Sequence, residues 1–170
     1  MTITQSKTNP ELTSDNQYLT FDIGDESFGM ALRQTREILE YSEITHVPLM
    51  PDFICGVINL RGDVVPVIDL SIRLEREPIK INKRTCIVVI ELHTFKQQYV
   101  LGLLADQVNE VVDIDSSKID KAPAFGAKIR SDFIQGIARK EDGTFIILLD
   151  AEKALSPNEL SVLVEKEINK

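Results

Sequence analysis

Tryptophan is absent from this chain of 170 residues, and histidine and cysteine occur only twice each. Aromatic residues make up 6% of the sequence and do not alternate with basic residues, so a platform for stacking nucleic-acid bases is not indicated. Acidic residues outnumber basic ones by 27 to 19, which gives a net charge of −8. Because such a chain is poorly suited to coating phosphate backbones, we expect no nucleic-acid partner. The short basic cluster at residues 80–84 (KINKR) is predicted to be a solvated loop.

Long hydrophobic runs are also missing. No apolar stretch approaches the roughly 20 residues needed to span a bilayer. Residues 1–17 are polar and lack the apolar centre of a signal peptide, so they are predicted to be a disordered tail. A cytoplasmic location is the expectation that follows.

The residues that usually carry catalysis are few and scattered. Cys55 and Cys86 lie in apolar, strand-like runs and are predicted to be buried free thiols in a reducing compartment. His46 and His93 are isolated from any cluster with metal-ligand spacing, so neither a metal nor a cofactor is expected. Phosphate-binding glycine motifs and the G-x-S-x-G nucleophile turn are absent. These absences favour a binding module over an enzyme.

Strand patterns dominate what is present. Hydrophobic residues make up 43% of the chain, enough for a substantial core. Pro66 cannot donate to a strand ladder, so its strand is predicted to lie at a sheet edge or to carry a bulge. Frequent short strands separated by turns indicate a mainly β barrel or sandwich. The predicted strands cover residues 18–24 and 27–32, two strands within 56–70, residues 85–92, one or two strands within 97–114, and residues 143–150.

Helices are predicted to be few and short. Residues 50–53 and 131–133 are each expected to form one helical turn. Asp69 and Asp150 each follow a strand and precede a helical stretch, and we expect both to cap free backbone N–H groups. Residues 156–170 begin with a capping box and continue with an apolar stripe, which predicts a C-terminal helix. That helix either packs on its own protein or binds a partner.

The two halves of the chain resemble each other. Gly29 corresponds to Gly102 and Glu37 to Glu110, each pair 73 residues apart. Gly56 corresponds to Gly136 at a distance of 80 residues, and Asp69 to Asp150 at 81. Because the matched residues keep their order, we infer a duplicated unit of about 70 to 80 residues. A unit of this size is marginal alone, so the two copies are expected to share a core and to form a groove at their junction.

The phrase GVINLRGDVVPVIDL at residues 56–70 makes the resemblance to a known family specific. Together with FDIGDESFGMALRQTREI at residues 21–38, GLLADQVNEV at residues 102–111, and the later FIQGIA and ILLD, it closely resembles the CheW family, the coupling proteins of bacterial chemosensory arrays. The resemblance covers residues 18–155, nearly everything except the tails.

The resemblance implies two SH3-like, five-stranded β-barrel subdomains with a few short helices. Subdomain one is expected at about residues 18–80 and subdomain two at about 81–155, with exchange of strands between them left open. It also implies a non-enzymatic adaptor that needs no cofactor. The expected partners are the tips of methyl-accepting chemoreceptors and the regulatory domain of the histidine kinase CheA. The protein would then be recruited from the cytoplasm to membrane-associated arrays.

Site residues carry over from the family position by position. Arg61 of the NLRG phrase and Glu37 are expected beside the receptor-tip groove, and we predict that they approach each other across the first barrel. Thr35 stands where the family usually has an apolar residue, which bears on receptor choice. Cys86 and Val108 match apolar positions that line the groove or pack in the core. The bare backbone of Gly56 is assigned to kinase binding, with a strand-start or bulge role as the alternative.

Other interpretations remain open at this point. Within the family, an adaptor for pilus-driven motility or another chemosensory-like pathway fits the same residues. Outside the family, a small enzyme that uses Cys55 or Cys86 with a histidine is the alternative from another class, and slow thiol labelling would argue against it. An oligonucleotide-binding barrel is disfavoured by the net charge of −8.

Overall fold

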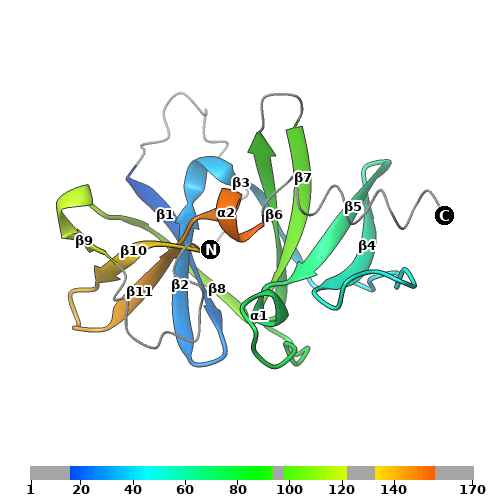
Figure 1. Cartoon of the computed structure of the whole chain (residues 1–170), viewed down its shortest axis with the longest axis horizontal. Helices are drawn as coiled ribbons and strands as arrows, with labels where there is room; N and C mark the ends of the chain where they lie inside the picture. Colours follow the sequence, from blue (N-terminus) through cyan, green and yellow to red (C-terminus); the bar gives the residue numbers. More distant parts are fainter. Residues whose placement is uncertain (1–15, 94–97, 122–132, 156–170) are drawn as a thin grey trace.

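The computed structural model describes residues 16–93, 98–121 and 133–155. The strands of these ranges form two sheets, drawn on the left (sheet A) and the right (sheet B) of Figure 1. From edge to edge, sheet A contains β8 (Gln107–Asp113), β1 (Gln17–Ile23), β2 (Glu26–Ala31), β11 (Phe145–Leu149), β10 (Ile134–Arg139) and β9 (Ile119–Asp120). Sheet B contains β3 (Thr35–Glu40), β6 (Cys86–His93), β7 (Gln98–Ala105), β5 (Asp63–Asp69) and β4 (Ile54–Leu60).

Helical structure in the described ranges is limited to single turns. The α-helices are α1 (Leu70–Arg73) and α2 (Ala151–Ala154), and the 3-10 turns are η3 (Leu32–Gln34) and η4 (Ser116–Lys118). The predicted mainly β fold with a few short helices is confirmed. None of the described helices is long and apolar enough to cross a membrane.

Each sheet takes strands from both halves of the chain. The hairpin β1–β2 of the first half completes sheet A, and the hairpin β6–β7 of the second half completes sheet B. The two exchanged hairpins join their hosts in the same way, because β2 runs parallel to β11 with Gly29 opposite Leu148, and β7 runs parallel to β5 with Gly102 opposite Val67. These residues keep the spacings of 73 and 81 seen in the sequence, so the duplication is confirmed. The sheets therefore do not divide the chain at about residue 80.

The chain also links the two edges of each sheet. After β3 it returns to pair with β4 through the bridge between Thr45 and Val57. After β8 it returns through β9, where Asp120 pairs with Ile137 of β10. This closure is compatible with the SH3-like barrels that the family resemblance implies.

A tight backbone approach at Gly56 makes the closure of sheet B possible. β4 shifts register between Ile54 and Gly56, and a Cβ atom at Gly56 would lie 2.1 Å from the carbonyl oxygen of Thr45. β10 has the same register shift before Gly136, where a Cβ would lie 2.8 Å from the carbonyl oxygen of Asp120. The structure therefore supports the bulge role for Gly56.

The main core lies between the two sheets. Sheet A contributes buried residues such as Leu19 and Phe21, and sheet B contributes Val88, Ile90 and Leu103 to the same cluster. Each fully buried side chain of this size stabilises the fold by roughly 1.5–3 kcal/mol. Smaller clusters fill sheet B and sheet A separately. Packing across the junction thus holds the sheets together as one body.

Of the two alternatives for the Pro66 strand, the edge position is wrong, because β5 runs between β7 and β4, whereas the ladder of β5 with β4 does carry a register shift, between Ile54 and Gly56. The ladder between β5 and β7 begins only at Val67, so the residues before it have a free side. Val57, opposite Pro66, directs its N–H and C=O to Thr45 instead. Pro66 therefore sits where no strand partner requires its missing N–H.

Both aspartates act as the predicted helix caps. Asp69 Oδ1 accepts hydrogen bonds from the backbone N–H groups of Ser71 (2.9 Å) and Ile72 (3.3 Å) at the start of α1. Asp150 Oδ1 accepts one from the N–H of Lys153 in α2. Residues 50–53 form turns rather than the predicted helix, with the N–H of Ile54 bonded to the carbonyl oxygen of Pro51.

The predicted tail (1–17) falls almost wholly outside the described residues, and β1 already begins at Gln17. The predicted C-terminal helix (156–170) lies outside them entirely, as does most of the helical turn at 131–133.

Cys55 and Cys86 are free thiols, but each is only half buried. The prediction of full burial was wrong because both lie on strand faces that the core clusters cover only in part. Burial raises the pKa of Cys55 to about 11, and the nearby Asp69 carboxylate adds to this shift. Burial also raises the pKa of Cys86, with a smaller contribution from Glu40.

We expect Gly56→Ala to lower the free energy of unfolding by about 2–5 kcal/mol, because the new methyl group meets a backbone oxygen and φ is +153°. Urea denaturation measures this change. Gly24→Ala is the matched control, since Gly24 also has a positive φ but open space around it, and its cost should be only about 1 kcal/mol. Equal costs for the two variants would contradict the tight approach.

We expect the Cys55 thiol to make stability fall at high pH. Because its pKa is higher in the folded state, the Cys55 thiol keeps its proton more firmly when the protein is folded. Its full contribution to the free energy of unfolding is therefore present below the unfolded pKa and is lost as the pH rises from 9 towards 11. In a Cys86→Ser background, the unfolding free energy of the Cys55 protein relative to Cys55→Ser should fall over this range by at most about 3 kcal/mol. A difference that stays constant with pH would show that Cys55 ionises normally.

Candidate functional site

The NLRG phrase forms the hairpin turn between β4 and β5. Arg61 and Gly62 occupy its two central positions with φ angles of +52° and +91°, the pattern of a type I′ turn. Asn59 supports the turn by accepting a hydrogen bond from the N–H of Gly62 at 3.0 Å. Asparagine is preferred where arginine stands here, because a longer side chain is strained at positive φ. The turn therefore holds Arg61 in a costly conformation that presents its side chain at the end of sheet B.

Glu37 meets this arginine from strand β3. A register shift between Thr35 and Glu37 places Glu37 opposite Val89, whose side chain packs inside sheet B. Glu37 Oε1 lies 2.5 Å from Arg61 Nη2, so the predicted approach of the two residues is confirmed. The arginine side chain is 65% exposed and the glutamate 18% exposed, so the pair adds only about 0–1 kcal/mol to stability.

The ion pair borders a groove of about 370 Å³. The apolar part of its lining comes from Leu60, Val64, Val65 and Val100, and Val64 is 69% exposed. Arg36 and Asp63 add one charge of each sign. Such a groove suits a protein segment that offers an aliphatic side chain beside a hydrogen-bond acceptor for the guanidinium. Sequence reasoning missed these apolar residues, although Val64 lies only two residues after the NLRG phrase.

Cys86 and Val108 lie together at the junction of the sheets. The Val108 backbone interacts with the Cys86 thiol, and that thiol donates a hydrogen bond to the carbonyl oxygen of Arg84 at 3.2 Å. The Val108 side chain packs against the core cluster shared by both sheets. The two residues therefore adjoin each other, and Cys86 pairs with Glu40, three residues along β3 from Glu37.

Thr35 lies two residues before Glu37 on β3 and far from Cys86. It faces Ile90, whereas Cys86 pairs with Glu40 five residues further along β3, a distance of about 16 Å. Its hydroxyl oxygen is buried and has no hydrogen-bond partner among the described residues. The predicted receptor-contact residues thus occupy two places, one around Glu37 on sheet B and one at the junction, rather than one cluster.

The described residues offer little for catalysis. They contain no group of three or more histidine, cysteine, aspartate or glutamate side chains that could hold a metal ion. Both thiols have raised pKa values, so neither is an activated nucleophile at neutral pH. The arrangement is suited to docking another polypeptide.

Comparison with known proteins agrees with this geometry. The CheW-like domain family matches residues 17–159. A chemotaxis protein CheW from Klebsiella aerogenes is 30% identical over 151 residues, which cover 89% of this chain and 88% of the relative. A probable chemotaxis protein CheW from Rhizobium etli is 32% identical over 145 residues, covering 85% and 90%.

The crystal structure of the scaffolding protein TtCheW from Thermoanaerobacter tengcongensis has the same fold. Its TM-score is 0.71 and its sequence identity 32%, over 81% of this chain and 85% of that one. With a family match over most of its length and a matching solved fold, the chain belongs to the CheW family of chemotaxis scaffold proteins.

Proposed function

We propose that this scaffold protein couples the cytoplasmic tips of methyl-accepting chemoreceptors to the histidine kinase CheA within membrane-associated arrays. Members of the family are adaptors rather than enzymes. The observation that carries the proposal is the Arg61–Glu37 pair at the edge of a groove whose lining is partly apolar and partly charged. This arrangement is suited to binding a partner rather than to catalysing a reaction.

The receptor contact is assigned to the groove and to the neighbouring positions. Glu37 engages one nitrogen of Arg61, and the exposed remainder of the guanidinium keeps donors available for carbonyl or carboxylate groups of a partner. Thr35, Cys86 and Val108 would extend the contact along sheet B and the junction. Individual contacts can be weak in an array, because repeated linkage raises the effective concentration.

The kinase contact is assigned to the region of Gly56. Gly56 is buried under Thr45, so its part in kinase binding would be to shape the closing segment of sheet B rather than to touch the kinase. The regulatory domain of CheA, which shares this fold in the family, is the proposed partner there. The protein would thus hold two partners on one rigid body.

We expect Arg61→Glu to weaken binding of a receptor-tip hairpin at least about tenfold while the unfolding free energy changes by no more than about 1 kcal/mol. Calorimetric titration with the purified hairpin measures binding, and a pull-down with the CheA regulatory domain checks the second partner. Combining Arg61→Glu with Glu37→Arg restores an ion pair in reverse. Stability should then recover and receptor binding should not; recovery of binding would show that the pair acts only on the fold.

Arg61→Asn provides a matched control for the strained turn. Asn-Gly is the favoured type I′ sequence, so this variant should keep the hairpin and its stability within about 1 kcal/mol. It removes the guanidinium and should lose receptor binding. If the Arg61 variants lose stability while the molecules that remain folded still bind the receptor hairpin, the ion pair has a purely structural role.

A further inference from the structure

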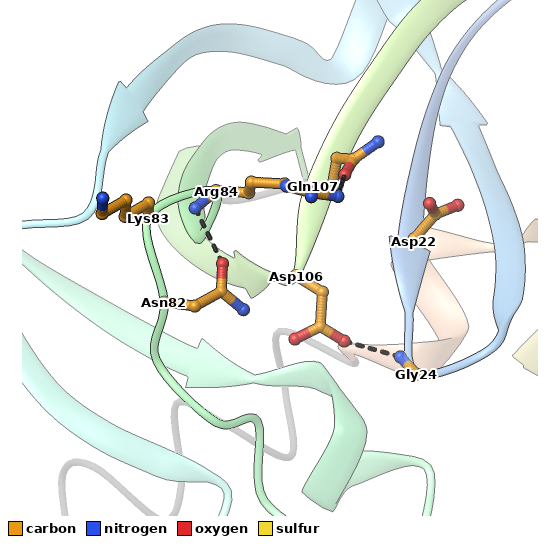
Figure 2. A pocket seen from close by; sticks show the side chains of 7 residues that line it. All are labelled: Asp22, Gly24, Asn82, Lys83, Arg84, Asp106 and Gln107. Atoms are coloured by element: carbon orange, nitrogen blue, oxygen red, sulfur yellow. Dashed lines mark hydrogen bonds between the residues drawn. The ribbon is translucent and has the colours of Figure 1, made fainter.

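A second pocket, of about 500 Å³, lies at the junction of the two sheets. Figure 2 shows Lys83 and Asp22 on opposite sides of it, with Arg84 reaching across to Gln107. The basic residues precede β6 of sheet B, whereas Gln107 begins β8 of sheet A. The pocket therefore joins the basic loop at residues 80–84 to the junction.

Hydrogen bonds hold this basic loop in one conformation. Asn82 Oδ1 accepts from the N–H of Arg84 at 2.7 Å, and the N–H of Asn82 donates to Thr85 Oγ1 at 2.9 Å. The N–H of Thr85 returns a bond to the carbonyl oxygen of Asn82. Because the backbone is fixed in this way, the side chains of Lys83 and Arg84 extend from a preorganised turn.

Neither cation of the pocket is neutralised internally. In the described part of the chain, Lys83 and Arg84 form no ion pair, and the guanidinium of Arg84 bonds to the neutral amide oxygen of Gln107 at 3.0 Å. The two carboxylates of the pocket bond to neutral groups instead of to these cations. Asp106 accepts from the N–H of Gly24 at 2.6 Å, and Asp22 Oδ1 accepts from two neutral side chains at 2.8 and 3.0 Å. Two positive charges thus face solvent at one side of the pocket of an acidic protein.

The basic side of the pocket is continuous with the proposed receptor surface. Cys86 lies two residues after Arg84 and donates its hydrogen bond to the carbonyl oxygen of that arginine. Val108 directly follows Gln107 in β8. Because side chains alternate along a strand, Val108 faces away from Gln107, and a segment that contacts Cys86 is the one that would pass within reach of the Arg84 guanidinium.

We propose that Lys83 and Arg84, the latter positioned by Gln107, form a specificity site that receives a carboxylate side chain of the docked receptor hairpin. This inference rests on the proposed receptor-coupling function. A guanidinium with a neutral partner keeps donors for a carboxylate without first breaking an ion pair. Asp22 and Asp106 repel a carboxylate from the opposite side of the pocket, which restricts the acidic residue of the partner to the basic side.

The site also affects how the partners meet. A chain with a net charge of −8 repels acidic segments over most of its surface, so a fixed pair of cations beside the docking surface orients the approach of one. The association rate should then depend on salt concentration, because rim charges act mainly on encounter.

The decisive variant is Gln107→Glu, which changes the neutral partner of Arg84 into an internal carboxylate competitor of the same shape. It should weaken binding of the native receptor-tip hairpin about threefold to tenfold and slow association at low salt. Arg84→Gln should do the same and should flatten the salt dependence of the association rate. Lys80→Gln is the matched control: it removes one positive charge from the same loop but lies outside the pocket, so binding should stay within twofold.

Stopped-flow association with the purified hairpin at several salt concentrations gives each result, and urea denaturation checks that every variant is folded. If Arg84→Gln and Lys80→Gln weaken binding equally, net charge alone explains the effect, and the proposal is overturned. Unchanged binding in folded Arg84→Gln and Gln107→Glu would also overturn it, while Arg61→Glu would still report on receptor coupling. Absence of any hairpin binding by the native protein would refute both the proposed function and this site.

Discussion

The structure depends on burial of one apolar cluster between two sheets that each need a hairpin from the other half of the chain. β1–β2 completes sheet A and β6–β7 completes sheet B, so neither half can form its own sheet without the other. Side chains such as Phe21 of sheet A and Ile90 of sheet B then pack in the same core. A half of this size would be marginal alone, and the exchange removes that weakness by making the two halves one folding unit. A rigid body with two different ends is what a scaffold requires.

Divergence of the two copies explains why only one end contains the NLRG turn. In the first copy a two-residue turn places Arg61 beside Glu37, and Val100 from the exchanged hairpin β6–β7 completes the lining of the groove. In the second copy Glu110 occupies the place of Glu37, but the turn is longer and is held by Asp142, which accepts hydrogen bonds from the N–H and hydroxyl of Thr144. Those bonds keep the pKa of Asp142 below its usual range. The two copies thus share a backbone fold, and their different turns give them different surfaces.

Local patterns in the sequence predicted most of the fold. Alternation and turn residues located most of the strands but missed β3 and β10, Asp69 and Asp150 marked the helix starts, and matched glycines revealed the duplication. The place of the Pro66 strand could not be predicted, because it depends on where the parallel ladder with β7 begins. The contact between Arg61 and Glu37 and a groove at the junction were anticipated, whereas the residues that line the pocket around Arg84 were not, because they come from segments far apart in the chain. Local spacing carries no information about which side chains meet at such a junction.

Native-state hydrogen exchange across a urea series tests most directly whether the exchanged hairpins make one cooperative body. The account predicts that the slowest amides of β1 and β11 in sheet A and of β6 and β5 in sheet B report the same unfolding free energy and the same dependence on urea. Opening of one sheet at a clearly lower free energy, while the other stays protected, would contradict it.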